Sequence, residues 1–281
     1  MTLQQAVRTS DTNARFRATV HRMSGIILPD GKSAMVEQRL RRRVLDTGQK
    51  CTDDYLQALM TGQLGEAEME LAIDLITTNT TSFFRESAHF DYLIDVILPR
   101  ILAESVSATP RLKLWSAACS EGAEAFTLAM VLADAQRSGL SFDWGVLGTD
   151  ISRSMVKKAR AAIYAADQVS TIASDLQHRY IMVPINPTGR GQVRIVPELR
   201  QKVRFQQMNL MDPTYPIDRD VDVIFMRNVL IYFNAEDRAH VVRRLISHLR
   251  PGGYLFVGHS EGMSVRAEGL ERLRPTIFRK L

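Results

Sequence analysis

Polar side chains that could bind a nucleoside follow the apolar runs typical of buried strands. The first run, Leu112 to Ala117, leads into a turn of small residues that ends at Gly122, and a helical pattern containing Glu124 follows. The second run, Trp144 to Thr149, ends at Asp150, about 28 residues after the turn. Small residues let the backbone approach a ligand closely, and nucleoside-binding α/β folds place a ribose-binding carboxylate at the end of the second strand. The turn and the acid together predict a ribose-binding site.

Each of these features also has a purely structural explanation. The turn is compatible with an ordinary strand-to-helix connection, and Asp150 could cap the predicted helix from Ser152 to Ala162. We favour the ribose role because turn and acid occur together at the right spacing. Asn209 and Asn228 follow two later predicted strands, and the carboxyl ends of parallel strands meet at one edge of a sheet.

The missing phosphate-binding motifs narrow the choice of ligand. The sequence has no GxxxxGK[ST] loop, and the turn SAACSEGAE lacks the GxGxxG spacing of a dinucleotide site. A ligand with a ribose and no phosphate fits better, which points to S-adenosylmethionine. The six histidines show no HExxH or similar spacing, so we expect no metal site, and we interpret His259 as a structural or rim residue.

The polar run TTNTTSFFRE, residues 77–86, offers hydroxyls, an amide and the cation of Arg85. Such a run is typical of a helix N-terminus, with Glu86 as an early acidic residue. It could equally supply donors and acceptors to a binding site. Residue propensities leave both interpretations open.

The order of the predicted elements indicates an α/β fold, a doubly wound Rossmann-like sheet. We expect a small helical N-terminal domain with a linker helix over residues 1–102 and the sheet domain over residues 103–281. An insertion at about 165–200 predicts a small antiparallel β subdomain, with a turn containing Pro187 and Gly189. The strands are expected at 112–117, 144–149, 203–208, 221–225 and 254–257, with a helix over 235–249 before the fifth and a final edge strand at 276–281.

Residues 1–15 are polar and unpatterned, and we expect a frayed lead-in there. The helix that follows Gly31 has an apolar side and, on another face, Arg39, Arg42 and Arg43 at helical spacing. A charged helix face is usually solvated. The segment 39–43 carries four arginines and no acid, so a docking surface for an acidic helix is the alternative.

Composition indicates a globular protein with acidic partners. The apolar fraction is 45%, the net charge is +5 and the isoelectric point is about 9.3. No apolar run approaches the ~20 residues of a membrane span, and the N-terminus lacks the apolar stretch of a signal peptide, so we expect a cytoplasmic protein.

Taken in order, these motifs resemble the chemotaxis receptor glutamate methyltransferases, the CheR family. TTNTTSFFRE matches the family pattern TTNxTxFFRE, and WSAACSEGAEAFTLAM matches WSAAxSxGEEPYSxAM. GTDIS, FQQMNLMD, VDVIFMRNVLIYF, LRPGGYLFVGHSE and IFRK follow in the family's order, from about Met23 to the C-terminus. The chain departs from the pattern at Ala123, Ala125 and Phe126, where the family usually has Glu, Pro and Tyr, and it keeps Glu124.

The resemblance implies a set of binding residues. Those that would line the S-adenosylmethionine site are Asn79, Thr81, Arg85, Glu124, Asp150, Asn209, Leu210, Arg227 and Asn228. The helix carrying Arg39, Arg42 and Arg43 corresponds to the family's receptor-contacting helix. The β subdomain corresponds to the part that in some members holds a receptor's C-terminal peptide.

The resemblance also implies the reaction. The sulfonium methyl is transferred in line to a glutamate side chain of a chemoreceptor, giving a glutamyl methyl ester and S-adenosylhomocysteine. Because a carboxylate is ionised at pH 7, no strong base is required, and positioning supplies most of the catalysis. We expect Arg85 and Tyr232 to orient the attacking carboxylate, although Arg85 could equally serve the cofactor. We expect a monomer.

Two alternatives remain. A nucleic-acid amino-methyltransferase would explain the high isoelectric point and the DPPY-like segment from Asp212 to Tyr215, but that motif should follow the fourth strand, where this chain has Arg227 and Asn228. A receptor-docking protein that binds the cofactor without turnover is suggested by the altered turn.

Overall fold

The computed structural model describes residues 3–184 and 191–281, with side chains from residue 11 onward. The chain forms two compact units, each with its own apolar core. The first contains residues 1–78, Asn209–Pro213 and Tyr232–Arg238, and the second contains Asn79–Met208, Thr214–Ile231 and Ala239–Leu281. Within the described residues, no helix combines the length and the apolar character that crossing a membrane requires.

The first unit is built from helices. On α2, Val36, Leu40 and Val44 recur every four residues and are buried, which confirms the predicted apolar side. They pack in one core with Tyr55 and Leu56 of α3. The helices are α1 (Leu3–Ser24), α2 (Ser33–Asp46), α3 (Thr52–Met60) and α4 (Glu66–Ile76).

The predicted lead-in over residues 1–15 is wrong, because α1 begins at Leu3. Phe16 and Val20, one helical turn apart, are fully buried in the core of the first unit. Once these residues hold a helix in place, each further residue is added at little cost. The helix therefore continues toward the N-terminus through a segment that lacks an apolar pattern.

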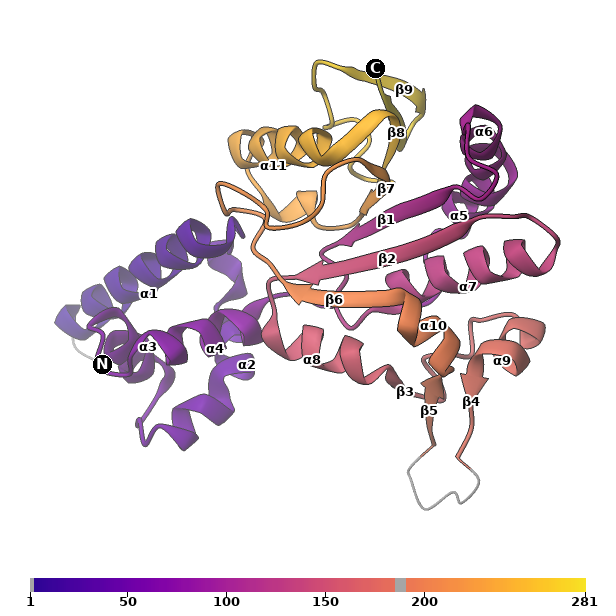
Figure 1. Cartoon of the computed structure of the whole chain (residues 1–281). Helices are drawn as coiled ribbons and strands as arrows, with labels where there is room; N and C mark the ends of the chain where they lie inside the picture. The colour runs from indigo at the N-terminus through magenta and orange to yellow at the C-terminus, as the bar shows by residue number, and fades with distance from the viewer. Residues whose placement is uncertain (1–2, 185–190) are drawn as a thin grey trace. The chain divides into compact units, whose positions relative to one another are not determined.

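A mixed sheet forms the centre of the second unit (Figure 1). Its strand order is β6-β2-β1-β7-β8-β10-β9; β1, β2, β6, β7 and β8 are parallel, and β10 runs antiparallel to β8 and β9. The strands are β1 (Arg111–Ala117), β2 (Asp143–Asp150), β6 (Val203–Gln207), β7 (Val221–Met226), β8 (Leu249–Val257), β9 (Leu270–Arg274) and β10 (Ile277–Lys280).

Helices cover this sheet and contribute aromatic rings to its core. The ring of Phe225 on β7 stacks on that of Phe256 on β8 at a centroid distance of 4.3 Å, and Phe90 stacks on Phe225 at 5.5 Å. The helices that carry residues of this unit are α5 (Ala88–Tyr92), a π-turn (Leu93–Ile97), α6 (Leu98–Glu104), α7 (Ala123–Arg137), α8 (Arg153–Ala161), α10 (Pro197–Lys202) and α11 (Ala235–His248).

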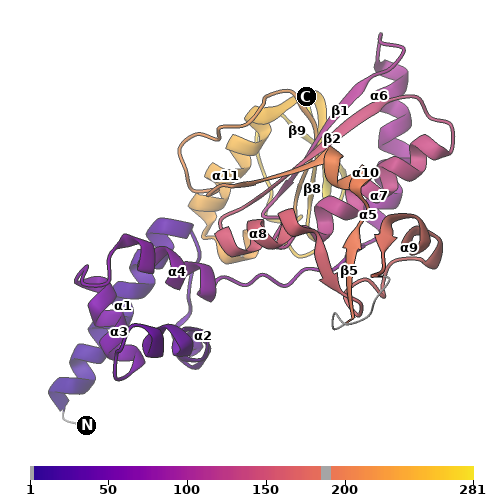
Figure 2. The same ribbon diagram turned by 60° about the horizontal axis from the view of Figure 1, so that its bottom comes forward.

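The insertion forms the predicted antiparallel β subdomain, a sheet of order β3-β5-β4 beside α9 (Ser174–Tyr180) (Figure 2). Its strands are β3 (Ile163–Ala165), β4 (Ile181–Met182) and β5 (Gln192–Ile195). The predicted turn with Pro187 and Gly189 lies outside the described residues.

Two predictions at the end of the chain need correction. The helix expected over 235–249 is found at Ala235–His248, but the strand expected at 254–257 already begins at Leu249. Gly253 therefore lies inside β8, where a Cβ would lie 2.9 and 3.1 Å from the carbonyl oxygens of Arg250 and Asp222. The final strand is not an edge strand, because β9 lies outside it. The sequence of β9 is largely charged and exposed, as edge strands often are, so no apolar pattern revealed it.

Candidate active site

The predicted turn of small residues lies between β1 and α7, and its backbone is strained. Ala118, Ser120 and Gly122 have positive φ angles of 59°, 51° and 90°. A side chain on Gly122 would lie 2.9 Å from the ring of Phe205, so this position needs glycine. The turn therefore has a tight backbone conformation at the carboxyl end of β1, and its Ser120 N–H donates to Asp150.

Asp150 lies against this turn at the end of β2. Its buried carboxylate accepts hydrogen bonds from the backbone N–H of Ser120 at 2.7 Å and of Ser152 at 2.9 Å. The alternative role of Asp150 as a helix cap is wrong, because Ser152 caps α8 by accepting from Met155 N at 3.0 Å. The structure thus brings the predicted acid and turn together.

Glu124 lies in the first turn of α7 and is largely buried. It accepts a hydrogen bond from Ser116 Oγ at 2.6 Å, and its Oε2 lies 3.6 Å from Arg227 Nε. Burial raises the pKa of Glu124, while Arg227 and the Ser116 bond oppose that rise. The carboxylate is therefore held in place by one cation and one hydroxyl.

Arg227 lies directly after β7 and contacts both Glu124 on α7 and the segment that contains Arg85 and Glu86. Its side chain is 1% exposed, and its Nη2 lies 3.6 Å from Glu86 Oε2 and donates to the carbonyl oxygen of Arg85. Its guanidinium carbon also lies 5.4 Å from the ring centroid of Phe90. Arg227 Nε and Nη1 have no hydrogen-bond partner among the described residues. A buried guanidinium with unused donors is suited to an acceptor on a bound ligand.

The segment 79–86 lies along the same site. Ser120 Oγ donates to the carbonyl of Asn79 at 2.7 Å, and the exposed Arg85 donates to the carbonyl of Thr80 at 3.2 Å. Thr81 is half-buried. The capping interpretation fails, because α5 begins only at Ala88 and no side-chain cap bond precedes it. The predicted site residues of this segment therefore stand beside the β1–α7 turn.

Sequence analysis missed Glu261, which organises the loop after β8. Its carboxylate is 1% exposed and accepts from the backbone N–H groups of Asn228 at 2.9 Å, Leu230 at 2.7 Å and Gly258 at 2.6 Å. A side chain on Gly258 would lie 2.7 Å from Glu261 and from the Asn228 amide. The GHSE motif was the signal for this residue, because its glycine and acid are spaced to form such a loop. Glu261 holds Asn228 in its left-handed conformation, with φ of 60°.

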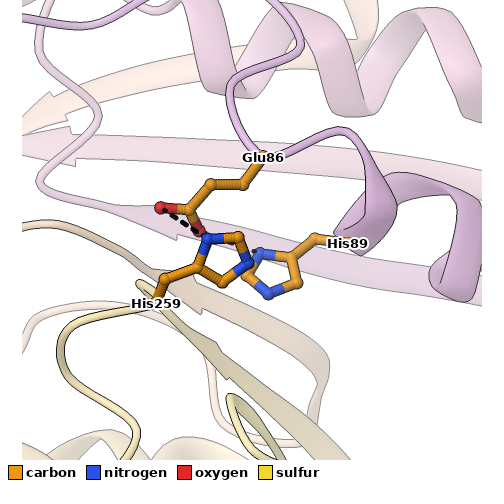
Figure 3. A group of neighbouring side chains, drawn as sticks. All are labelled: Glu86, His89 and His259. Atoms are coloured by element: carbon orange, nitrogen blue, oxygen red, sulfur yellow. Dashed lines mark ion pairs between the residues drawn. The ribbon is translucent and has the colours of Figure 1, made fainter.

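A second group that spacing did not reveal consists of Glu86, His89 and His259 (Figure 3). Burial and the nearby Arg227 lower the pKa of His89 to about 4. The pKa of Glu86 is also lowered, because attraction to Arg227 and the hydrogen bond from Asn228 outweigh the effect of burial. His89 is therefore neutral and Glu86 ionised at pH 7.

Three predicted site residues, Asn209, Leu210 and Tyr232, belong to the first unit. There Asn209 donates to the carbonyl of Met23, and the Tyr232 carbonyl accepts from Ile27 N at 2.9 Å. Their roles in binding and catalysis stay predictions.

The arginines of α2 are used in different ways. Arg39 donates to the carbonyl oxygens of Ile76 and Thr77 at 2.6 and 2.7 Å. Arg43 forms a bidentate ion pair with the Glu68 carboxylate at 2.8 and 2.7 Å. The Arg42 side chain is 90% exposed. Arg39 and Arg43 thus stabilise the first unit itself, whereas Arg42 is mostly exposed and lies 3.9 Å from Asp46.

These residues fit S-adenosylmethionine. Asp150 is an acceptor suited to ribose hydroxyls, and the turn beside it brings backbone close to a ligand. Arg227 offers buried donors that lack a partner among the described residues. The DPPY-like segment follows β6, whereas β7 is followed by Arg227, so the position of the motif stays wrong for an amino-methyltransferase.

Comparison with known proteins agrees with this geometry. Residues 79–277 match the model of the CheR methyltransferase, SAM binding domain, and residues 12–77 match that of the CheR methyltransferase, all-alpha domain. A chemotaxis protein methyltransferase of Borreliella burgdorferi is 34% identical, with 97% of this chain and 95% of the relative covered. Those of Salmonella typhimurium and Escherichia coli are 36% and 35% identical, covering 93% of this chain and 88% and 89% of the relatives. The chain belongs to the CheR methyltransferase family and has its S-adenosylmethionine-binding domain.

Proposed function

We propose that the protein methylates glutamate side chains of chemoreceptors, using S-adenosylmethionine as the methyl donor. The observation that carries the proposal is the strained turn at Ser120 held against Asp150, in a chain of the CheR family. The cofactor supplies an electrophilic methyl group on sulfur; its bond to sulfur breaks with the electron pair left on sulfur as the bond to a glutamate oxygen forms. A cytoplasmic monomer acting on the cytoplasmic part of the receptor is part of this proposal.

The residues of the chain position the reactants. Asp150 binds the ribose hydroxyls, and Glu124 and Arg227 form the polar wall beside the β1–α7 turn. Arg85, which is exposed, orients the receptor carboxylate together with Tyr232. Because the acceptor is already ionised at pH 7, the site needs no general base, and orientation carries the rate.

The remaining site residues hold this arrangement. Asn79, whose carbonyl accepts from Ser120 Oγ, and Thr81 line the cofactor site, and Asn228 donates to Glu86 at 3.3 Å. Asn209 and Leu210 complete the cofactor site in this proposal. The small β subdomain is a candidate surface for an extended receptor peptide, because a strand edge can take up a further strand.

The test is transfer of a radiolabelled methyl group from S-adenosylmethionine to membranes that contain chemoreceptors. We expect label on the receptor that mild base releases as methanol, since esters are base-labile. Asp150→Ala should weaken cofactor binding by about 10- to 150-fold, equivalent to ~1.5–3 kcal/mol for a charged hydrogen-bonding group. Asp150→Asn, which keeps an oxygen acceptor for the turn, separates loss of charge from loss of structure.

Asp143→Ala is the matched control, because Asp143 begins the same strand and pairs with Lys202 at the protein surface. It should leave cofactor binding and methyl transfer unchanged. Cofactor binding without label on the receptor would contradict the enzymatic proposal and favour a docking protein. Base-stable label, or label on nucleic acid, would contradict the glutamate ester.

A further inference from the structure

Glu86, His89 and His259 come from two separate parts of the second unit and converge on one point. Glu86 Oε2 lies 3.5 Å from His89 Nδ1, and Glu86 Oε1 lies 3.9 Å from His259 Nδ1. One ligand atom from each of the three residues lies within 4.8 Å of the others. The two imidazole rings lie edge to face at a centroid distance of 5.4 Å and an interplanar angle of 60°. Figure 3 shows the Glu86 carboxylate beside them.

The facing atoms of this group are unsatisfied. His89 is 3% exposed, and among the described residues neither its Nδ1 nor Glu86 Oε2 has a hydrogen-bond partner. His89 Nε2 lies 2.8 Å from Thr276 Oγ1. When Nε2–H donates to this hydroxyl, the lone pair of Nδ1 faces the carboxylate oxygen. In this tautomer two buried acceptors face each other, and a cation or a donor between them would stabilise the pair.

The carboxylates around the group can accommodate a cation beside Arg227. Arg227 is shared between Glu86 and Glu124, at 3.6 Å from each carboxylate. If a cation bound to Glu86, Arg227 would still be paired with Glu124, so its buried guanidinium would keep a counter-charge. Asn228 would continue to donate to Glu86 Oε1.

Two imidazole nitrogens and one carboxylate oxygen are the ligand set of open zinc sites, in which a water molecule takes the fourth position. Tetrahedral zinc with bonds of ~2.0–2.1 Å needs its ligands about 3.3 Å apart. The ligand atoms lie within 4.8 Å of one another, so side-chain rotation must bring them closer by up to about 1.5 Å. The His259 side chain is 65% exposed, which gives an ion and its water ligand access. The contact of His89 with Thr276 fixes the ring, as partners of metal-bound histidines do.

We propose that Glu86, His89 and His259 form a binding site for a divalent metal ion of the zinc class. The ion would tie the loop that follows β8 to the start of α5. This proposal does not depend on the receptor reaction, because it concerns binding of the metal alone.

The test is metal binding by the untagged full-length protein after chelation and buffer exchange. We expect one Zn²⁺ per chain by calorimetry, and with Co²⁺ a visible absorption band of a four-coordinate site that Zn²⁺ displaces. His259→Ala should weaken Zn²⁺ binding by about 10- to 100-fold or more. Loss of a residue that only hydrogen-bonds a metal ligand already has an effect of about this size. Because His259 is exposed, this variant should fold, which circular dichroism checks.

His178→Ala is the matched control, since His178 is an exposed histidine on α9 whose Nδ1 lies 2.6 Å from the carbonyl oxygen of Ser174 in the same helix. It should bind Zn²⁺ and Co²⁺ as the wild type does. Equal metal binding by His259→Ala and the wild type would overturn the proposal. Absence of a Co²⁺ band in the wild-type protein would overturn it as well.

Discussion

Arg227 Nε lies 3.6 Å from Glu124 Oε2 inside the second unit, where the arginine side chain is only 1% exposed. The same guanidinium lies 3.6 Å from Glu86 and donates to the backbone of the segment that precedes α5. One buried cation therefore joins the carboxyl end of β7, the start of α7 and the TTNTTSFFRE segment. Removing one partner of a buried ion pair leaves an uncompensated charge. It destabilises a protein more than replacing both partners by uncharged residues does.

Arg227→Ala should lower the free energy of unfolding by about 3–5 kcal/mol, because it leaves Glu86 and Glu124 without their counter-charge. Urea denaturation measures this as a lower midpoint. The double variant Arg227→Met with Glu124→Gln should recover part of the lost free energy of unfolding, because it removes the charges of both Arg227 and Glu124. Arg42→Ala, a change on the exposed face of α2, should stay within about 0.5 kcal/mol of wild type. A loss below about 1 kcal/mol in Arg227→Ala would contradict the role of this arginine as a structural connector.

The two neighbouring arginines of α2 should respond differently to substitution. Arg42→Glu should raise the apparent KM for receptor by about 5- to 10-fold, equivalent to ~1–1.4 kcal/mol, if an acidic receptor helix docks here. Cofactor affinity should not change, because the Arg42 side chain is 90% exposed. Stability should fall by no more than about 0.5 kcal/mol, from the contact of the new glutamate with Asp46. Lys157→Glu, a charge reversal on the exposed face of α8, is the control for net charge.

Arg43→Ala is unsuitable as a docking test and serves as a contrast. Arg43 and Tyr55 both bind Glu68, and the Arg43 hydrogen bond, opposed by burial, lowers the pKa of that carboxyl. Removing the Arg43 side chain should lower the free energy of unfolding by about 2 kcal/mol, as expected for loss of a hydrogen bond to a charged group.

An unchanged KM for receptor in Arg42→Glu would show that the arginine face of α2 is solvated.

The sequence was most informative where residues close along the chain make the structure. The turn at Ser120, the acid at Asp150 and the apolar side of α2 follow from local spacing, and each was predicted. Periodicity placed Arg43 on a polar face but could not identify Glu68 as its partner, because that contact depends on how helices pack. For the same reason, no local pattern could reveal that the loop after β8 brings His259 beside Glu86.

His89 should make stability depend on pH between about 6.5 and 4. Burial lowers its pKa from 6.5 to about 4, so in this range the unfolded chain binds a proton that the folded protein does not. Stability from this residue is complete above pH 6.5 and decreases on acidification toward pH 4. A pKa lowered from 6.5 to about 4 corresponds to about 3 kcal/mol.

Urea denaturation across this pH range, with EDTA present, measures the effect of His89. Glu124 works in the opposite sense, because burial raises its pKa and its contribution decreases as pH rises. Glu86 has a lowered pKa, so its contribution is lost at lower pH than the window of His89. The comparison of wild type with His89→Gln isolates the histidine, since both carboxyls are common to the two proteins. We expect the decrease in stability between pH 6.5 and 4 to be smaller in His89→Gln, and parallel pH profiles would show that His89 protonates as easily in the folded protein as in the unfolded chain.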